Sequence, residues 1–235
     1  MKRILLHILT AAAVVVGAGA TQTATAQEPA ATSHTADADA VSVRKVLFLG
    51  DSMTGWLAER LGAYANRNGF EVATVVWDGS TLAKWGAGNR LHALMEAQRP
   101  DAVFICLGMN DMFSQAPERQ FGGRLQAIRE ALGETPFVWI GPPSWPGKKQ
   151  GAAFNEWLGA ELGADRYFRS DSLDLPRQSR SNPHPTREGM TAWMDSVVEW
   201  LPQHTRILLP AGEKPQPREM RRGKTFIYKR MNETL

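Results

Sequence analysis

The stretch VLFLGDS, at residues 46–52, decides the fold of this chain. Four large apolar residues are followed at once by Gly50, Asp51 and Ser52, and apolar residues at helical spacing begin soon afterwards. A short apolar run bounded by turn residues is typical of a strand that is buried on both faces of a sheet. The stretch therefore predicts a buried strand that ends in a polar turn and leads into a helix.

The same pattern recurs along the chain. Further apolar runs occupy residues 72–77, 102–107 and 137–140. Stretches with apolar residues at helical spacing lie between and after these runs, at residues 56–64, 91–95, 121–132 and 192–200. Strands that alternate with helices favour a parallel sheet covered on both faces. We expect an α/β fold in three layers, with a last helix that ends at Pro202.

Both ends of the chain depart from this pattern. Residues 1–26 combine a basic start, an apolar run and small residues before a cleavage site, which is the pattern of a secretory signal peptide. Residues 27–43 hold hardly any large apolar side chain, so we expect a flexible spacer before a folded domain at residues 44–202. Residues 203–235 form a basic, Pro-containing extension. A solvated extension with one strand near residues 225–228 is favoured over a tail that binds an anionic polymer.

Charge and cysteine content exclude several classes of function. The chain has 27 Lys and Arg residues against 24 Asp and Glu residues, and only the extension is basic, so nucleic-acid binding is poorly supported. Cys106 is the single cysteine, so no disulfide can form within the chain. The five histidines are scattered and predict no metal site. The apolar run of the signal is short for a spanning helix, and we expect no stable membrane insertion after cleavage.

Ser52 is a candidate nucleophile. Ligands bind beyond the carboxyl ends of the strands in a parallel sheet, and Ser52 follows the first predicted strand directly. The helix that begins next would direct backbone N–H groups at the same point. The alternative is that Asp51 or Ser52 only caps this helix. Residue 54 is Thr, so the G-x-S-x-G elbow of α/β-hydrolases is absent.

Three other segments hold candidate polar groups. Asn110, in LGMND at residues 107–111, follows the third predicted strand, and Gly79 follows the second. A side-chain amide and a backbone N–H at these places could stabilise an oxyanion, although both segments could equally be ordinary turns. His184 lies between two prolines, which hold it in a rigid, non-helical segment. It is the histidine best placed to be the base that a serine nucleophile needs.

In content, order and placement, these four motifs resemble the SGNH hydrolase superfamily, also called the GDSL esterases and lipases. The resemblance covers residues 45–201. It implies a flavodoxin-like, three-layer α/β/α sandwich with a parallel sheet of about five strands, and hydrolysis of acyl esters without a cofactor. Ser52 would be the nucleophile and His184 its general base. The backbone amides of Ser52 and Gly79 and the side chain of Asn110 would form the oxyanion hole.

One position departs from the family pattern. The family usually has Asp three residues before the catalytic His, and this chain has Ser181 there. An acid in that role orients the imidazole and stabilises its charged form. Ser181 or a backbone carbonyl could orient His184 instead, or Asp171 or Asp174 could approach from the preceding loop. The third alternative is a weakly active or inactive protein that binds glycans on the same scaffold.

The predicted export and the aromatic content suggest a substrate. Exposed indoles suit sugar rings, although tryptophans also fill cores. We predict a substrate pocket that includes Asp51, Trp77, Trp85 and Trp145. The expected substrate is a small acyl ester, above all an acetyl ester, on a carbohydrate or cell-envelope glycan in the periplasm or outside the cell. A lipid esterase, a thioesterase and a polysaccharide acyltransferase are the alternatives.

Overall fold

A computed structural model describes residues 40–145, 151–179, 181–182, 184–210 and 212–235 of the chain. The predicted signal peptide at residues 1–26 and most of the predicted spacer lie outside the described residues. Part of the loop that follows Trp145 lies outside them as well.

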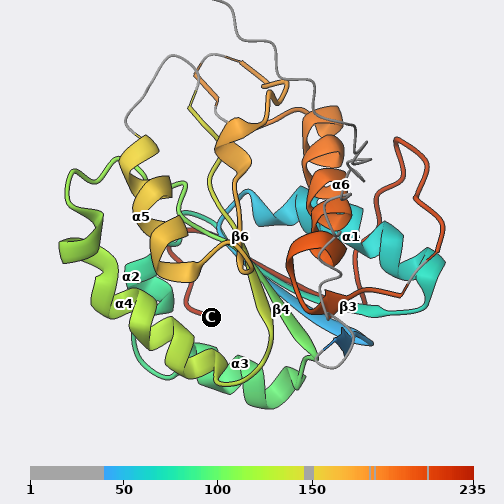
Figure 1. Ribbon diagram of the computed structural model, residues 1–235, viewed down its shortest axis with the longest axis horizontal. Coiled ribbons are helices and arrows are strands. Elements are labelled where there is room, and N and C mark those ends of the chain that lie inside the picture. Colours follow the sequence, from blue (N-terminus) through green and yellow to red (C-terminus); the bar gives the residue numbers. More distant parts are fainter. Residues whose placement is uncertain (1–39, 146–150, 180, 183, 211) are drawn as a thin grey trace, which may run out of the picture. The chain divides into compact units, whose positions relative to one another are not determined.

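A parallel six-stranded sheet confirms the predicted α/β fold (Figure 1). Its strands, in spatial order, are β6 (Tyr167–Phe168), β5 (Phe137–Ile140), β4 (Ala102–Cys106), β2 (Lys45–Gly50), β3 (Glu71–Trp77) and β8 (Thr225–Lys229). The residues of β2 from Val46 to Leu49 are at most 1% exposed, as the continuous apolar run predicted. The separate strands β1 (Val41–Ser42) and β7 (Ile207–Leu208) form a small parallel pair.

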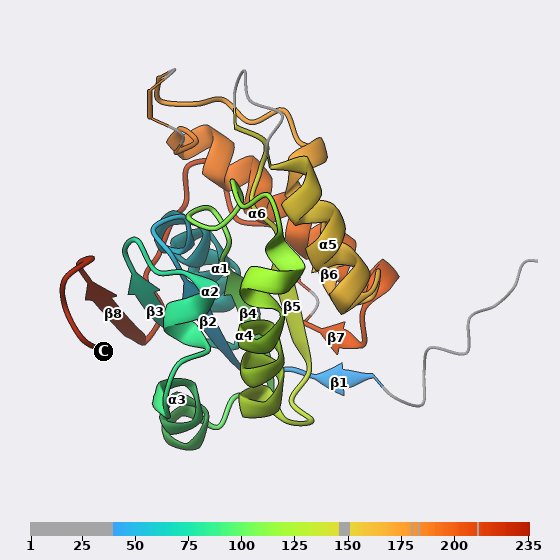
Figure 2. The same ribbon diagram turned by 90° about the vertical axis from the view of Figure 1, so that its left-hand side faces the viewer.

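Helices cover both faces of the sheet. They are α1 (Thr54–Asn68), α2 (Leu82–Trp85), α3 (Arg90–Gln98), α4 (Pro117–Leu132), α5 (Ala152–Leu162) and α6 (Arg187–His204). In Figures 1 and 2, α1 and α6 lie on one face, and α2, α3, α4 and α5 lie on the other. The chain leaves the central strand β2 toward β3 and later returns to β4 on its other side. The carboxyl ends of β2 and β4 therefore mark the point where the strand order reverses, which is the usual ligand site of such sheets.

Local sequence signals account for the end of α1 but not for the end of α6. Helix α1 ends at Gly69, whose left-handed φ of 76° lets its N–H bond to the carbonyl of Ala65. The prediction that the last helix ends at Pro202 is wrong, because α6 continues to His204. Leu201 is buried and the ring of His204 stacks on Trp200 with centroids 4.7 Å apart, so packing extends the helix beyond the proline.

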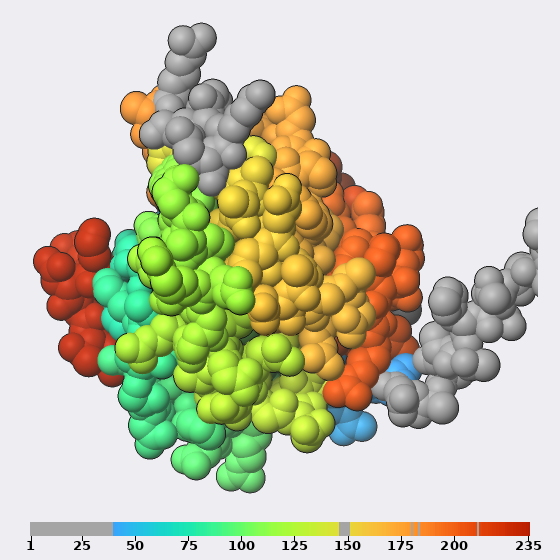
Figure 3. Space-filling model, turned by 60° about the vertical axis from the view of Figure 1, so that its left-hand side comes forward, coloured from blue at the N-terminus to red at the C-terminus, as the bar shows by residue number. Residues whose placement is uncertain are grey.

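The C-terminal extension belongs to the fold. The strand expected near residues 225–228 is β8, which pairs with the outer edge of β3 and adds a sixth strand to the predicted five. An open strand edge offers unpaired N–H and C=O groups that such a strand can satisfy. In Figure 3 the end of the chain, in dark red, lies at the surface beside the teal segment that follows β3.

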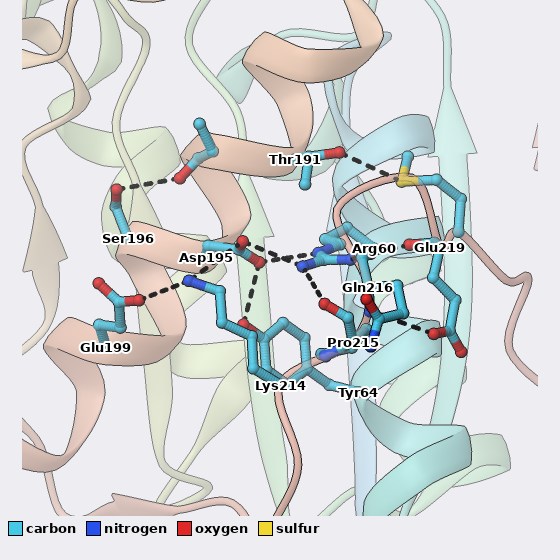
Figure 4. A network of polar contacts seen from close by, with 12 residues as sticks. Arg60, Tyr64, Thr191, Asp195, Ser196, Glu199, Lys214, Pro215, Gln216 and Glu219 are labelled. Atoms are coloured by element: carbon cyan, nitrogen blue, oxygen red, sulfur yellow. Dashed lines mark hydrogen bonds and ion pairs between the residues drawn. The ribbon is translucent and has the colours of Figure 1, made fainter.

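A buried ion pair holds the segment that leads to β8 (Figure 4). The guanidinium of Arg60 in α1 is fully buried and binds both carboxylate oxygens of Asp195 in α6, at 2.7 and 3.0 Å. Its other N–H groups donate to three backbone carbonyls of the extension, those of Pro215, Gln216 and Glu219. The expectation of a merely solvated extension is therefore wrong for this part of the chain.

The described residues include no helix with the length and hydropathy that crossing a membrane would need.

Candidate active site

Ser52 lies just beyond the carboxyl end of β2, where the predicted strand leads into α1. Gly50 makes this turn possible, because a Cβ atom there would lie 1.8 Å from the carbonyl oxygen of Cys106 in β4. The N–H of Asp51 donates to the same carbonyl at 3.0 Å. Close contact between β2 and β4 therefore places Ser52 at the central edge of the sheet.

The buried carboxylate of Asp51 stabilises this turn through hydrogen bonds. Asp51 is 1% exposed, and its carboxylate accepts hydrogen bonds from the N–H groups of Met53 and Met109, at 3.0 and 3.2 Å. Burial raises its pKa to about 7, against the lowering effect of these N–H groups. The prediction that Asp51 lines the substrate pocket is wrong, because its side chain ties the Ser52 turn to the loop after β4. Asp51 bonds to the first helical turn, which leaves the Ser52 hydroxyl for another partner.

That partner is His184. The Oγ atom of Ser52 lies 2.9 Å from Nε2 of His184, although the two residues are far apart in the sequence. The histidine segment is held on both sides, since Gln178 donates its N–H to the His184 carbonyl and Thr186 caps α6 through the N–H of Gly189. The proximity of the hydroxyl and the imidazole is what a serine nucleophile and its base require.

Asn182 orients the imidazole. Its Oδ1 lies 2.8 Å from Nδ1 of His184 and also accepts the backbone N–H of His184 at 3.1 Å. A backbone N–H can only donate, so the atom that faces the ring is the amide oxygen. The amide nitrogen donates to Oε1 of Gln178 at 2.8 Å, which is consistent with the same orientation. Nδ1 therefore carries the proton, and Nε2 is free to accept the proton of Ser52.

The predicted candidates for orienting His184 were Ser181, Asp171 and Asp174, and the structure places Asn182 in this role instead. Ser181 contacts the hydroxyl of Ser179, and Asp171 pairs with Arg169 at 2.7 Å. Neither these two side chains nor Asp174 occupies the place beside Nδ1 that Asn182 fills. The signal was present in the sequence, because an Asn side chain often accepts the N–H of the second residue after it. The family spacing predicts the orienting residue at position 181 instead, three residues before His184.

Burial lowers the pKa of His184 from its ordinary value of 6.5. Asp78 opposes this effect and Arg177 adds to it. A neutral imidazole is the form that accepts a proton, so the lowered pKa keeps the base available in mildly acidic solution.

We expect the acidic limb of the pH profile of kcat/KM to lie below pH 6.5, the ordinary pKa of histidine, because burial lowers the pKa of His184. Asn182→Asp should move that limb to higher pH, since a carboxylate beside Nδ1 stabilises the charged imidazole. Hydrolysis of p-nitrophenyl acetate over a pH series measures both. Asn66→Asp, near the far end of α1, is the matched control and should leave the limb in place. An unmoved limb in Asn182→Asp would contradict the role assigned to this contact.

The three N–H donors predicted for the oxyanion hole belong to Ser52, Gly79 and Asn110. Within the described residues, the backbone N–H groups of Ser52 and Gly79 have no hydrogen-bond partner. Gly79 has a φ of 63°, and a Cβ atom there would lie 2.9 Å from the side chain of Met231. The exposed Asn110 donates one N–H of its amide to the Ser80 carbonyl at 2.9 Å, which fixes the amide and leaves its second N–H to donate elsewhere.

Asn110→Ala should lower kcat about 100-fold while KM changes little, as for other donors that stabilise an oxyanion. The amide contributes to the transition state more than to the bound ester, which explains the effect on kcat. Steady-state kinetics on p-nitrophenyl acetate measure it, and circular dichroism checks the fold. Unchanged turnover would remove Asn110 from the oxyanion hole.

A pocket of about 340 Å³ opens beside Ser52 and His184. Sequence reasoning missed the aromatic residues that line it, which are Trp56, Phe226 and Tyr228. The helical spacing of the apolar residues at positions 56–64 predicts that Trp56 faces the core, but its side chain is 41% exposed. Phe226 and Tyr228 belong to the extension, whose place in the sheet no local signal revealed.

The tryptophans predicted to line the substrate pocket, Trp77, Trp85 and Trp145, are not among the residues that line it. Trp77 and Trp85 are 6% and 1% exposed and pack edge to face, with ring centroids 5.6 Å apart. They fill the core, which was the alternative interpretation. Trp145 is half-buried against the exposed ring of Phe113, at a centroid distance of 5.4 Å. Among the described residues, no group of three His, Cys, Asp or Glu side chains is placed to hold a metal ion.

Comparisons with known proteins identify the family to which this chain belongs. Residues 32–192 match a family described as GDSL-like lipase/acylhydrolase. No curated protein matches the sequence significantly. A structure of a G-D-S-L family protein from Desulfitobacterium hafniense DCB-2 is similar over 66% of this chain and 97% of its own, with 18% identity and a TM-score of 0.50.

Two other solved structures are similar at a lower level. The lipase/acylhydrolase from Enterococcus faecalis matches 72% of this chain and 100% of its own, with 19% identity and a TM-score of 0.49. The family 3 carbohydrate esterase from Clostridium thermocellum matches 67% of this chain and 94% of its own, with 14% identity and a TM-score of 0.47.

Proposed function

Since this chain belongs to the GDSL-like lipase/acylhydrolase family, whose members act on carboxylic esters, we propose that Ser52 and His184 hydrolyse a small acyl ester on a carbohydrate. The single observation that carries the catalytic part is the 2.9 Å contact between Ser52 Oγ and His184 Nε2, with Asn182 holding the imidazole in the accepting tautomer. This contact also favours an active hydrolase over an inactive scaffold, because it places an oriented base within hydrogen-bond distance of the serine hydroxyl.

The reaction follows from this arrangement. Ser52 Oγ attacks the ester carbonyl while His184 Nε2 takes the hydroxyl proton. The N–H groups of Ser52, Gly79 and Asn110 stabilise the oxyanion of the tetrahedral intermediate. Its collapse breaks the bond to the alcohol, which leaves with the proton from His184. Water then attacks the acyl-serine, gives one proton to His184, and releases the acid as the proton returns to Ser52.

The pocket supports a polar alcohol. It has charged and polar side chains in its walls, including Glu59, Asp78 and Arg222. An exposed indole, that of Trp56, lies among them and provides a flat apolar face of the kind that sugar rings contact. An acetyl ester of a carbohydrate or cell-envelope glycan suits both features. The pattern of residues 1–26 supports export, and we propose action in the periplasm or outside the cell.

The test compares acyl chains and alcohols directly. The mature protein should hydrolyse p-nitrophenyl acetate and acetylated sugars, and p-nitrophenyl palmitate far more slowly. A fluorophosphonate probe should label the protein at Ser52, because this reaction requires an activated serine. Robust cleavage of palmitate with no activity on acetylated sugars would instead establish a lipid esterase. If the protein is neither labelled by the probe nor hydrolyses any of these esters, the glycan-binding alternative would be supported instead.

A further inference from the structure

The last strand of the chain forms one wall of the pocket beside Ser52. In the parallel register of β3 and β8, Phe226 is opposite Thr74 and Tyr228 is opposite Val76. Side chains two residues apart on a strand point to the same face. Phe226, Tyr228 and Val76 all line the pocket, together with Trp56 in the first turn of α1, so they share the face of the sheet that α1 covers.

The pocket lies on one particular side of Ser52. Its lining includes Ser52 and His184 but neither Gly79 nor Asn110, which carry oxyanion donors. In the proposed reaction the ester carbonyl oxygen faces those donors, and the alcohol oxygen faces His184, from which it receives its proton. The pocket is therefore positioned to hold the alcohol part of the ester.

Polar pairs in the walls determine which alcohol fits. Arg222 binds Glu59 at 3.0 Å, and its guanidinium lies 4.6 Å from the centre of the Phe226 ring. The hydroxyl of Tyr228 donates to the carboxylate of Asp78. Hydroxyl groups of a sugar can exchange hydrogen bonds with such pairs. Two carboxylates against one guanidinium disfavour an anionic alcohol.

We propose that the C-terminal segment, residues 213–229, builds a leaving-group subsite that selects a neutral sugar. This proposal rests on the proposed esterase function and adds a role for the extension. Trp56 provides the face on which the sugar ring stacks. Arg222 and Tyr228, with their partners Glu59 and Asp78, bind its hydroxyl groups.

Three acetyl esters test the subsite. An acetylated methyl glucoside carries a neutral sugar, an acetylated methyl glucuronoside carries an anionic one, and ethyl acetate has an alcohol too small to fill the pocket. The wild type should prefer the glucoside to the glucuronoside about tenfold in kcat/KM. Arg222→Ala and Trp56→Ala should each raise KM for the glucoside about tenfold, with a smaller effect on kcat/KM for ethyl acetate.

Arg218→Ala is the matched control. Arg218 is an exposed arginine of the same segment that does not line the pocket, so this variant should behave as wild type on all three esters. Tyr228→Phe removes one hydroxyl with little risk to the fold and should affect the glucoside in the same direction. Equal losses on the glucoside and on ethyl acetate, or no loss on either, would overturn the subsite.

The outcomes also separate the two proposals. Wild-type hydrolysis of ethyl acetate without hydrolysis of either sugar ester would overturn the subsite and the carbohydrate substrate, and would leave the esterase activity of Ser52 and His184 intact. Preference for the glucuronoside would overturn the selection of a neutral sugar. Absence of all three activities would overturn the esterase and the subsite together.

Discussion

Ser52→Ala should lower kcat on p-nitrophenyl acetate by about 10⁵-fold, the scale of loss when a serine nucleophile is removed. The variant lacks the hydroxyl oxygen that lies 2.9 Å from His184 Nε2, so no acyl-serine can form. The oxyanion donors remain, and a small residual rate above the uncatalysed reaction should persist. The measurement is initial-rate kinetics with substrate well above KM.

His184→Ala should produce a loss of similar size, and the double variant should be no worse than either single one. Two residues that act as one unit give losses that do not add. Ser196→Ala is the matched control, because the hydroxyl of this serine donates to the Ala192 carbonyl of its own helix, and the variant should keep full activity. Turnover by Ser52→Ala close to wild type would place the chemistry elsewhere in the molecule.

The strands β2, β3, β4 and β5 and the position of Ser52 were predictable because their signals are local. Each of these strands contains an apolar run, and a glycine ends β2 where the backbone of β4 approaches. The pairing of Ser52 with His184 could be expected from the prolines that flank His184 and from the family resemblance. Their contact depends on how α6 packs against α1, which no local pattern encodes.

Asn182 and the tryptophans show where prediction failed and why. The orienting role of Asn182 depends on which of its two amide atoms faces the ring, and three hydrogen bonds decide that. Trp77 and Trp85 follow strand ends just as pocket residues do, yet their rings turn inward against each other. Composition cannot tell a tryptophan in a core from one in a pocket, because both follow the same sequence patterns.

The C-terminal extension was the largest gap, because long-range contacts determine its position. Its prolines and basic residues predict a solvated tail. Arg60 changes that outcome, since it is the buried residue that joins α1, α6 and the backbone of residues 215–219. An arginine on the buried face of a helix was the one sequence signal that a charged partner must exist.

Arg60→Met should lower the free energy of unfolding by about 3–5 kcal/mol, the usual effect of removing one member of a buried ion pair. The variant leaves the carboxylate of Asp195 without its main partner, although Tyr64 still donates to it at 2.9 Å. Three backbone carbonyls of the extension also lose their donor. Urea denaturation followed by circular dichroism measures the change. Arg67→Met is the matched control, because Arg67 lies on the same helix and forms surface ion pairs, for which about 1 kcal/mol or less is expected.

The double variant Arg60→Met/Asp195→Leu separates the ion pair from the attachment of the extension. If the loss of the buried guanidinium beside Asp195 causes the instability, replacing both partners should restore much of the free energy of unfolding, because well-packed apolar pairs can replace buried ion pairs. The carbonyls of Pro215, Gln216 and Glu219 lack their donor in the single and the double variant, so we expect a loosened C-terminal segment and a raised KM for an acetylated glucoside in both. A double variant with restored stability and wild-type KM would show that Arg60 stabilises the fold without positioning the pocket wall. An Arg60→Met protein as stable as Arg67→Met would contradict the role of the buried pair itself.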